Sequence, residues 1–316
     1  MCREEGKPLI YTLNHNLKRK MTLKVLLQTF RPTFLILSFV CVFLGFSTAF
    51  STQEPLNLLT VFLILIGAIS AHISVNALNE YVDYKSGLDF ITTKTAFSGG
   101  SGALPGQPKM AGAALTSGLI ALALTIGIGI VFTLEYGTQI LPIGITGVLL
   151  IISYSPWLNR SPFLCLIAPG LGFGILMVLG THILLSSPLD PAPWLISLIP
   201  FCLNNNLLLL NQYPDISADK SVGRRTFPIV YGTHKSTLTY AFFMLVAYSL
   251  IVALIIEGVL PKLSSIALAP LMLSSYAFIG AYKHGSKIGQ HSKHLAANVA
   301  AAISTPLLLG ISIVVT

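Results

Sequence analysis

The stretch LNLLTVFLILIGAISAHISVNALNEYVDYKSGLD, residues 56 to 89, joins a long apolar run to a group of polar side chains. A hydrocarbon core of about 30 Å is crossed by roughly 20 apolar residues in an α-helix. Residues 56–79 meet that length. The stretch therefore predicts a membrane-spanning helix that ends in clustered amide and carboxylate side chains.

The composition of the whole chain agrees with a membrane protein. Hydrophobic residues make up 53% of the 316 residues and charged residues only 9%, which is too apolar for a water-exposed surface around one core. We predict an all-α, polytopic membrane protein with nine transmembrane helices. The predicted spans are 32–50, 56–79, 111–134, 139–155, 162–185, 192–211, 236–256, 263–282 and 294–315.

The basic residues predict how this bundle is oriented. With nine spans, all of the 19 Lys and Arg residues except Lys262 fall on the side of the N-terminus, and the positive-inside rule makes that side cytoplasmic. We expect a basic N-terminal arm at 1–31, a single transmembrane domain at 32–316 and a C-terminus outside. The net charge of +8 indicates attraction to anionic lipid headgroups rather than to nucleic acid.

A second polar loop, NQYPDISADKSVGRRT at 211–226, repeats the spacing of the first. Asn79 and Asp83 are four positions apart, as are Asn211 and Asp215, and each residue of the first pair precedes its counterpart by 132 positions. Each pair closes an even-numbered predicted span. The spacing favours a parallel repeat of four helices, spans 1–4 and 5–8, with a ninth helix appended.

The two loops carry the residue types of a magnesium and diphosphate site. In the first, Gly87 lets the chain turn so that Asp89 returns toward Asp83, and in the second Pro214 breaks the membrane helix and starts a short new one. Carboxylate and amide oxygens suit a hard cation such as Mg²⁺, and cations beside it suit a diphosphate. The candidate metal ligands are Asn79, Asp83, Asp89, Asp215 and Asp219, with Lys94, Lys220, Arg224 and Arg225 beside them.

Several polar residues have a plainer interpretation. Acidic residues at a helix end are often solvated caps, although the matched spacing of the two loops favours a shared site. His72 and His182 are expected to be packing histidines. Asn204 to Asn206 either line a pocket or bond across helices, and the glycine-rich segment 97–107 either folds over the site or is a linker.

Both loops resemble the Asp-rich motifs of the UbiA superfamily of intramembrane prenyltransferases. NALNEYVDYKSGLD at 76–89 is similar to the first motif, in the form found in the branch that prenylates 1,4-dihydroxy-2-naphthoate for menaquinone, and the second loop is similar to the second motif. Arg31-Pro32 and the YSPW stretch beginning at Tyr154 also resemble family features. Glu80 departs from the pattern, because Asp is commoner there.

The resemblance implies a central cavity open to lipid and a cytoplasmic site in a cell (inner) membrane, with Mg²⁺, a polyprenyl diphosphate and a small aromatic acceptor as ligands. Asp83 and Asp215 would be the main catalytic residues. The diphosphate would be bound by Lys94, Asn211, Lys220, Arg224, Arg225, Arg31 and Tyr154. Other aromatic acceptors, such as 4-hydroxybenzoate or a tetrapyrrole, and a cation transporter remain as alternatives. No obligatory protein partner is evident.

Overall fold

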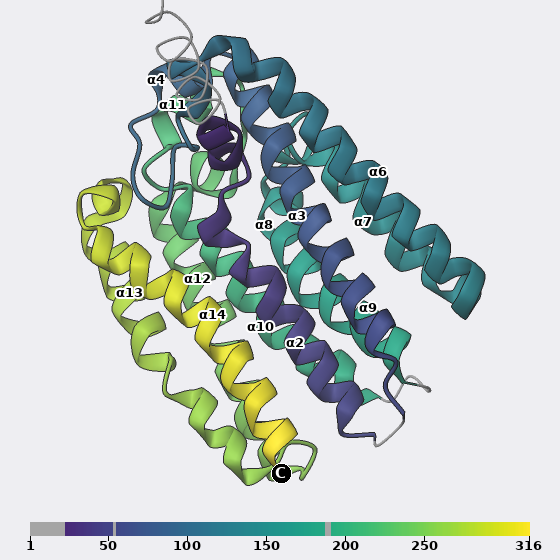
Figure 1. Ribbon diagram of the computed structural model, residues 1–316. Helices are drawn as coiled ribbons and strands as arrows, with labels where there is room; N and C mark the ends of the chain where they lie inside the picture. The colour runs from purple at the N-terminus through teal and green to yellow at the C-terminus, as the bar shows by residue number, and fades with distance from the viewer. Residues whose placement is uncertain (1–22, 53–54, 187–190) are drawn as a thin grey trace, which may run out of the picture.

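The computed structural model describes residues 23–52, 55–186 and 191–316, and within these ranges every regular element is helical (Figure 1). The predicted all-α architecture is confirmed for these residues. The main helices are α2 (Ile36–Phe50), α3 (Leu58–Lys85), α6 (Ala111–Tyr136), α7 (Leu141–Tyr154), α8 (Pro162–Pro169), α9 (Val178–Leu185), α10 (Pro191–Asn211), α12 (Phe227–Ile256), α13 (Leu271–His284) and α14 (Ser292–Val315).

Eight helical segments in the described ranges are long and apolar enough to cross a membrane. They coincide with eight of the nine predicted spans. The remaining one, predicted at 139–155, is formed by η3 (Thr138–Ile140) and α7, which together cover Thr138–Tyr154. At 1.5 Å per residue this segment is about 25 Å long, shorter than a hydrocarbon core of about 30 Å.

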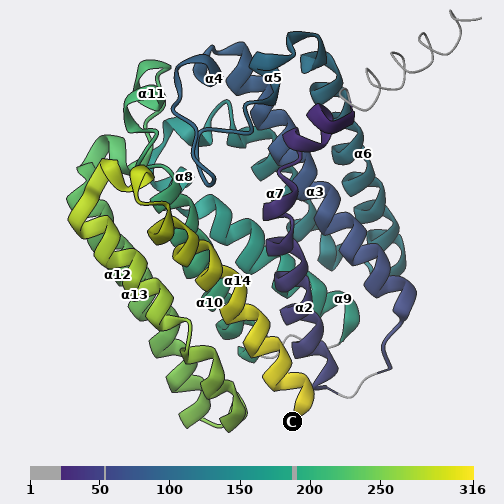
Figure 2. The ribbon, with the colours of Figure 1, turned by 60° about the vertical axis from the view of Figure 1, so that its left-hand side comes forward.

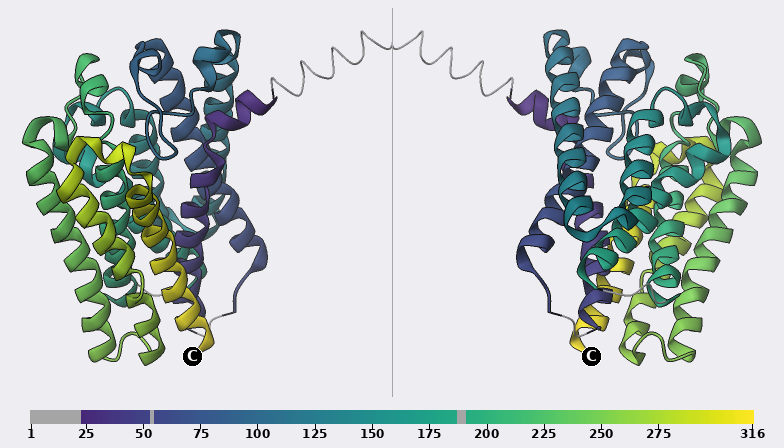
Figure 3. Two further views of the ribbon diagram at one scale, coloured as in Figure 1. Left: turned by 90° about the vertical axis from the view of Figure 1, so that its left-hand side faces the viewer. Right: turned by 90° about the vertical axis from the view of Figure 1, so that its right-hand side faces the viewer.

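The short helices gather at one end of the bundle. The end that carries α4 (Leu88–Ile91), α5 (Ala103–Gly106) and α11 (Ile216–Ser221) lies opposite the C-terminus (Figures 1 and 2). The same arrangement is seen from both sides of the molecule (Figure 3). The two polar loops are therefore brought to a common end. Residues 1–22 of the predicted basic arm lie outside the described residues.

Close packing against α10 explains part of the Asn204–Asn206 run. A π-helical segment, η5 (Gly170–Met177), joins α8 to α9. A Cβ added at Gly170 or Gly174 would collide with the backbone of Phe201 on α10. At this contact the Gly170 N–H donates to Asn205 Oδ1 over 2.7 Å. Asn205 therefore serves helix–helix contact, as one of the two interpretations of this run predicted.

The largest apolar core combines buried residues of α2, α10, α12, α13 and α14. A polar contact crosses this core where Asn206 Nδ2 donates to the Tyr240 carbonyl over 2.9 Å. Asn298 Nδ2 in turn donates to the Asn206 carbonyl over 3.0 Å. Such bonds satisfy amides that would be costly to bury unpaired in a membrane. They hold α10, α12 and α14 together beside the cavity described next.

Candidate functional site

A cavity of about 400 Å³ runs from the polar loops into the bundle. Its polar end is lined by Arg31, Asn79, Asp83, Asp89, Tyr154, Asn211, Asp215, Asp219 and Arg224. Its apolar part is lined by side chains of α2, α3, α6, η3, α7, η5, α9 and α10, and includes Ile64, Phe132, Ile140 and Leu184. The structure thus brings both polar loops to the mouth of one apolar chamber.

The first loop holds its carboxylates on a continuous helix. Asn79 and Asp83 both belong to α3, one turn apart, and Asn79 Nδ2 donates to Asp83 Oδ2 over 2.8 Å. Asn79 Oδ1 in turn accepts from the Ser155 hydroxyl over 3.0 Å. Gly87 adopts φ 81° and precedes α4, which carries Asp89 back to the cavity. The turn predicted at Gly87 is confirmed.

The second loop is built differently. α10 ends at Asn211, and α11 begins only at Ile216. Pro214 lies in the turn between them rather than at the first position of the new helix, which corrects our expectation. The break follows because proline cannot donate the backbone hydrogen bond that a continuing helix needs. Asp215 then precedes α11, and its carboxylate is placed by the turn instead of by α10.

Arg224 joins the two loops. Its guanidinium donates to Asp219 Oδ1 over 2.9 Å and forms a second ion pair with Asp83 on α3. The Arg224 side chain is 16% exposed and the two carboxylates are less so. Removing one member of such a buried group would leave an uncompensated charge. Arg224 therefore fixes the separation between the two Asp-rich loops.

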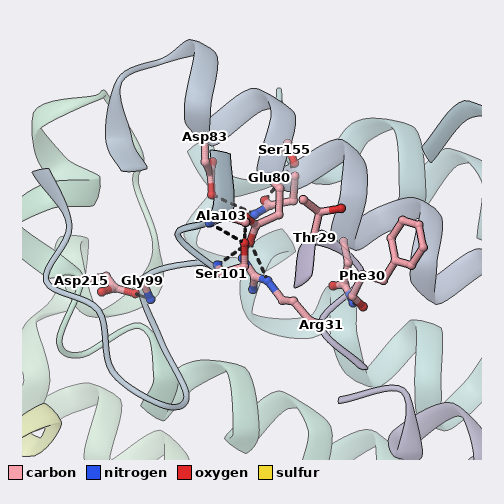
Figure 4. A network of polar contacts seen from close by, with 12 residues as sticks. Thr29, Phe30, Arg31, Glu80, Asp83, Gly99, Ser101, Ala103, Ser155 and Asp215 are labelled. Atoms are coloured by element: carbon pink, nitrogen blue, oxygen red, sulfur yellow. Dashed lines mark hydrogen bonds and ion pairs between the residues drawn. The ribbon is translucent and has the colours of Figure 1, made fainter. Parts of the chain in front are cut away.

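Glu80, the residue that departs from the family pattern, anchors the glycine-rich segment (Figure 4). Its buried carboxylate accepts from Arg31 Nε over 2.9 Å and Nη2 over 2.6 Å, and from the Ser101 N–H over 2.8 Å and hydroxyl over 2.6 Å. Among the described residues, Arg31 alone has a positive φ without being glycine, at 50°. Such a backbone costs about 1–3 kcal/mol and tends to occur at functional sites.

The glycine-rich segment folds over the site, which decides between the two interpretations of residues 97–107. The Gly99 N–H donates to Asp215 Oδ2 over 3.0 Å (Figure 4). Gly99, Gly100 and Gly102 all have positive φ, and a Cβ at Gly100 would lie 2.9 Å from Asp89 Oδ1. Glycines are needed here for the backbone conformation and for the close approach to carboxylates.

The predicted diphosphate-binding residues separate into two groups. Arg31, Tyr154, Asn211 and Arg224 line the cavity. By contrast, the side chains of Lys94, Lys220 and Arg225 are exposed and are not part of its lining. Arg31 lines the cavity. In the sequence, only the Arg31-Pro32 pair had marked it as a candidate.

Three oxygen atoms at the cavity mouth fit a hard cation. Asp89 Oδ2, Asn211 Oδ1 and Asp215 Oδ1 are buried and accept no hydrogen bond. Burial, with the nearby carboxylates of Glu80 and Asp83, raises the pKa of Asp89 to about 7. Burial and the Asp219 carboxylate likewise raise the pKa of Asp215 to about 7. A bound divalent cation would relieve this by favouring the ionised carboxylates.

The side chains do not form a complete metal centre by themselves. Over the described ranges, no three His, Cys, Asp or Glu side chains converge in a way that could hold an ion. Mg²⁺ usually keeps several waters and binds through one or two carboxylates together with substrate phosphates. The donor set therefore fits Mg²⁺ held jointly by the loops, water and a phosphate ligand.

Sequence reasoning missed the positioning residues of the site. Glu80 was noted only as a departure, and Ser101 and Ser155 were not considered. Their partners are 21 and 76 positions away in the chain. No local pattern carries that information.

The family model of the UbiA prenyltransferase family matches residues 38–296, most of the chain. The chain belongs to the UbiA prenyltransferase family. The resemblance of the two Asp-rich loops is thereby confirmed, and the choice between an enzyme and a transporter is settled in favour of a prenyltransferase.

A curated relative of this UbiA-family protein is 1,4-dihydroxy-2-naphthoate octaprenyltransferase of Bacillus subtilis (strain 168). The two are 30% identical over 246 residues, which cover 74% of this chain and 75% of the relative.

Solved structures share the UbiA fold. A UbiA homolog from Aeropyrum pernix K1 matches with a TM-score of 0.67 at 17% identity, covering 89% of this chain and 97% of its own. A homolog from Archaeoglobus fulgidus bound to DMAPP and Mg²⁺ matches with a TM-score of 0.60 at 15% identity, covering 92% and 99%.

Proposed function

We propose that this chain transfers a polyprenyl group from a polyprenyl diphosphate to 1,4-dihydroxy-2-naphthoate, with Mg²⁺ as cofactor. The observation that carries the proposal is the cavity at the two Asp-rich loops, which has carboxylates and guanidinium groups at its mouth and apolar walls beyond. The acceptor is supported by the form of the first Asp-rich loop and by the B. subtilis relative.

The apolar part of the cavity suits a polyprenyl tail. Asp83 and Ile64 both line the cavity and lie 19 residues apart on α3, a rise of about 28 Å. Burial of apolar surface contributes about 25 cal/mol per Å², so a long hydrocarbon chain is bound strongly along these walls. The diphosphate would remain at the mouth, beside Arg31 and Arg224.

The metal would be held by Asp89, Asn211 and Asp215, whose oxygens lack partners, with Asn79, Asp83 and Asp219 completing the site. Mg²⁺, when bound, would neutralise the diphosphate and make it a better leaving group. Lys94, Lys220 and Arg225, being exposed, would attract the anionic substrate to the site rather than contact it in the cavity.

The residues at the mouth account for the chemistry. Arg31 and Arg224 would stabilise the charge that develops on the diphosphate as the allylic C–O bond breaks. The electron-rich ring of the acceptor then forms the new C–C bond with the prenyl cation. Loss of the ring carboxylate as CO₂ restores aromaticity, and the products are the prenylated ring, CO₂ and diphosphate.

The end that carries the site would face the cytoplasm of a cell (inner) membrane. The excess of Lys and Arg on that side supports this orientation, because positive residues are enriched in cytoplasmic loops. The single-domain organisation at 32–316 and the four-helix repeat are part of the same proposal, supported by the 132-residue offset between the loops.

An acceptor panel with purified protein tests the function. Geranylgeranyl or longer diphosphate is supplied with Mg²⁺ and with dihydroxynaphthoate, 4-hydroxybenzoate, homogentisate or a chlorophyllide, and products are identified by mass spectrometry. We expect the prenylated, decarboxylated naphthalene product, and none when EDTA replaces Mg²⁺. Product from 4-hydroxybenzoate and none from dihydroxynaphthoate would make 4-hydroxybenzoate the acceptor. Undiminished turnover in EDTA would refute the metal requirement.

A further inference from the structure

Deeper in the cavity lies a polar pair that the proposed chemistry leaves unused. His72 on α3 and Asn204 on α10 both line the cavity, and they are only 5% and 1% exposed. Polar side chains within a membrane-spanning segment are costly, and they generally face a partner or a functional cavity. A pair of them on the wall of an apolar chamber therefore calls for a ligand or a structural partner.

The two residues hold equivalent places with respect to the Asp-rich loops. His72 precedes Asn79 by seven residues, and Asn204 precedes Asn211 by seven, so the pair shows the same 132-residue offset as the loops. Seven residues of α-helix rise about 10 Å. His72 and Asn204 thus form a second polar layer about 10 Å below the layer of Asn79 and Asn211.

The hydrogen bonds already made by the pair leave one atom of each for a ligand. His72 Nδ1 lies 2.9 Å from Ser38 Oγ on α2, so Nε2 is the ring nitrogen left over. Asn204 Nδ2 donates to the Pro200 carbonyl over 2.8 Å, while its Oδ1 is buried and accepts no hydrogen bond. Asn205 and Asn206 also keep one unpartnered atom each, but neither lines the cavity.

We propose that His72 and Asn204 bind the ring oxygen of the aromatic acceptor that lies farthest from the diphosphate. This inference rests on the proposed prenyl transfer to an aromatic ring. Two para oxygens of a dihydroxyarene are about 6 Å apart, and a hydrogen bond adds about 3 Å. The sum is close to the separation of the two polar layers. An acceptor bound to the pair by one oxygen therefore extends to the layer of Asn79 and Asn211, where the allylic carbon of the prenyl donor would lie.

The surroundings of His72 suit an aromatic ligand. The Phe173 ring stands edge-on to His72 with centroids 4.7 Å apart, and Phe173 also lines the cavity. Aromatic rings favour such edge-to-face or offset arrangements at centroid distances of about 4.5–7 Å. Gly172 beside Phe173 leaves open space, since a Cβ there would meet no atom within 4 Å. The pair therefore selects a flat, oxygen-bearing acceptor over an alkyl chain.

Steady-state kinetics of the full-length protein test the site. In His72→Leu and Asn204→Leu, KM for the acceptor should rise about tenfold or more, as expected when a buried hydrogen-bond partner is lost. KM for the polyprenyl diphosphate should not rise by more than about twofold, because its charged contacts at the mouth are unchanged and a leucine on the wall remains compatible with its apolar tail. Should a leucine variant fail to fold, His72→Phe and Asn204→Ala remove the same hydrogen-bonding groups and give the same comparison.

His182 provides the matched control. It is a buried histidine that bonds Thr48 of α2 through Nδ1 over 3.1 Å, much as His72 bonds Ser38, but it does not line the cavity. His182→Leu should leave the KM of the acceptor unchanged. An equal rise in His182→Leu would show that loss of the helix contact alone explains the effect.

An acceptor analogue lacking one ring hydroxyl closes the test. In the wild-type protein, KM for the analogue should be about tenfold higher than KM for the intact acceptor. In His72→Leu the two KM values should be nearly equal, because the interaction is already absent. Unchanged acceptor KM in both variants, with only a lower melting temperature, would assign the pair to helix contact and overturn the inference. Absence of transfer to every aromatic acceptor by the wild-type protein would instead refute the proposed function.

Discussion

The two Asp-rich loops share one spacing but place their carboxylates with different backbones. Asp83 is carried by α3, which continues to Lys85, whereas α10 ends at Asn211 and Asp215 follows a turn through Pro214. The first carboxylate is held by Asn79 and Arg224. The second receives one N–H from Gly99 and keeps Oδ1 without a partner.

The difference separates a half of the site whose carboxylate is fully hydrogen-bonded from a half whose carboxylate keeps one oxygen without a partner. A carboxylate with its hydrogen bonds satisfied is rigid and stabilising, while a buried oxygen without a donor favours binding of a cation. The comparison teaches that equal residue spacing does not imply equal roles. Asp83 should matter for both structure and reaction, and Asp215 chiefly for the reaction.

The largest expected effect comes from Asp83→Asn and Asp215→Asn. Each should lower turnover by about 10²–10³, because charge stabilisation at the diphosphate is lost. Only Asp83→Asn should lower the melting temperature, since removing one partner of a buried ion pair costs about 3 kcal/mol. Turnover and thermal unfolding in detergent measure both. Near-native turnover in both variants would show that the two carboxylates are solvated helix caps and take no part in the reaction.

Neighbouring arginines sharpen the comparison further. Arg224 bridges Asp83 and Asp219, whereas Arg225 is exposed. We expect Arg224→Gln to reduce kcat/KM about 100-fold, as loss of a charged transition-state contact does. Arg225→Gln should change it by a few-fold at most and should weaken only the salt dependence of binding. Equal losses in the two variants would contradict the assignment of Arg224 to the cavity.

The smallest effect is expected where Glu80 holds Arg31 and the glycine-rich segment. Glu80→Gln keeps the size of the side chain but removes the charge that pairs with Arg31, so we expect turnover to fall about tenfold, in line with a charged hydrogen bond of about 1.5 kcal/mol or more. Ser101→Ala, which removes one of the four bonds to Glu80, should cost less. Kinetics with both variants decide, and an effect of Ser101→Ala larger than that of Glu80→Gln would contradict this order.

Particular residues show how far sequence reasoning reached. The apolar runs, the turn at Gly87 and the pairing of the two loops were predicted correctly, because helix length, glycine conformation and residue spacing are local properties. The position of Pro214 and the exposure of Lys94, Lys220 and Arg225 were not, because burial depends on what packs against a residue from elsewhere in the chain. The nine-span topology and the side of the membrane remain predictions.

By itself, the sequence determined that this protein is an all-α membrane protein with two matched Asp-rich loops, since composition and periodicity act through local hydration and helix geometry. Tertiary structure alone decided that Glu80 joins Arg31 to Ser101, that Arg224 bridges the loops, and that His72 and Asn204 face one cavity. These contacts join residues up to 141 positions apart. Only the packing of whole helices brings such side chains within hydrogen-bonding distance.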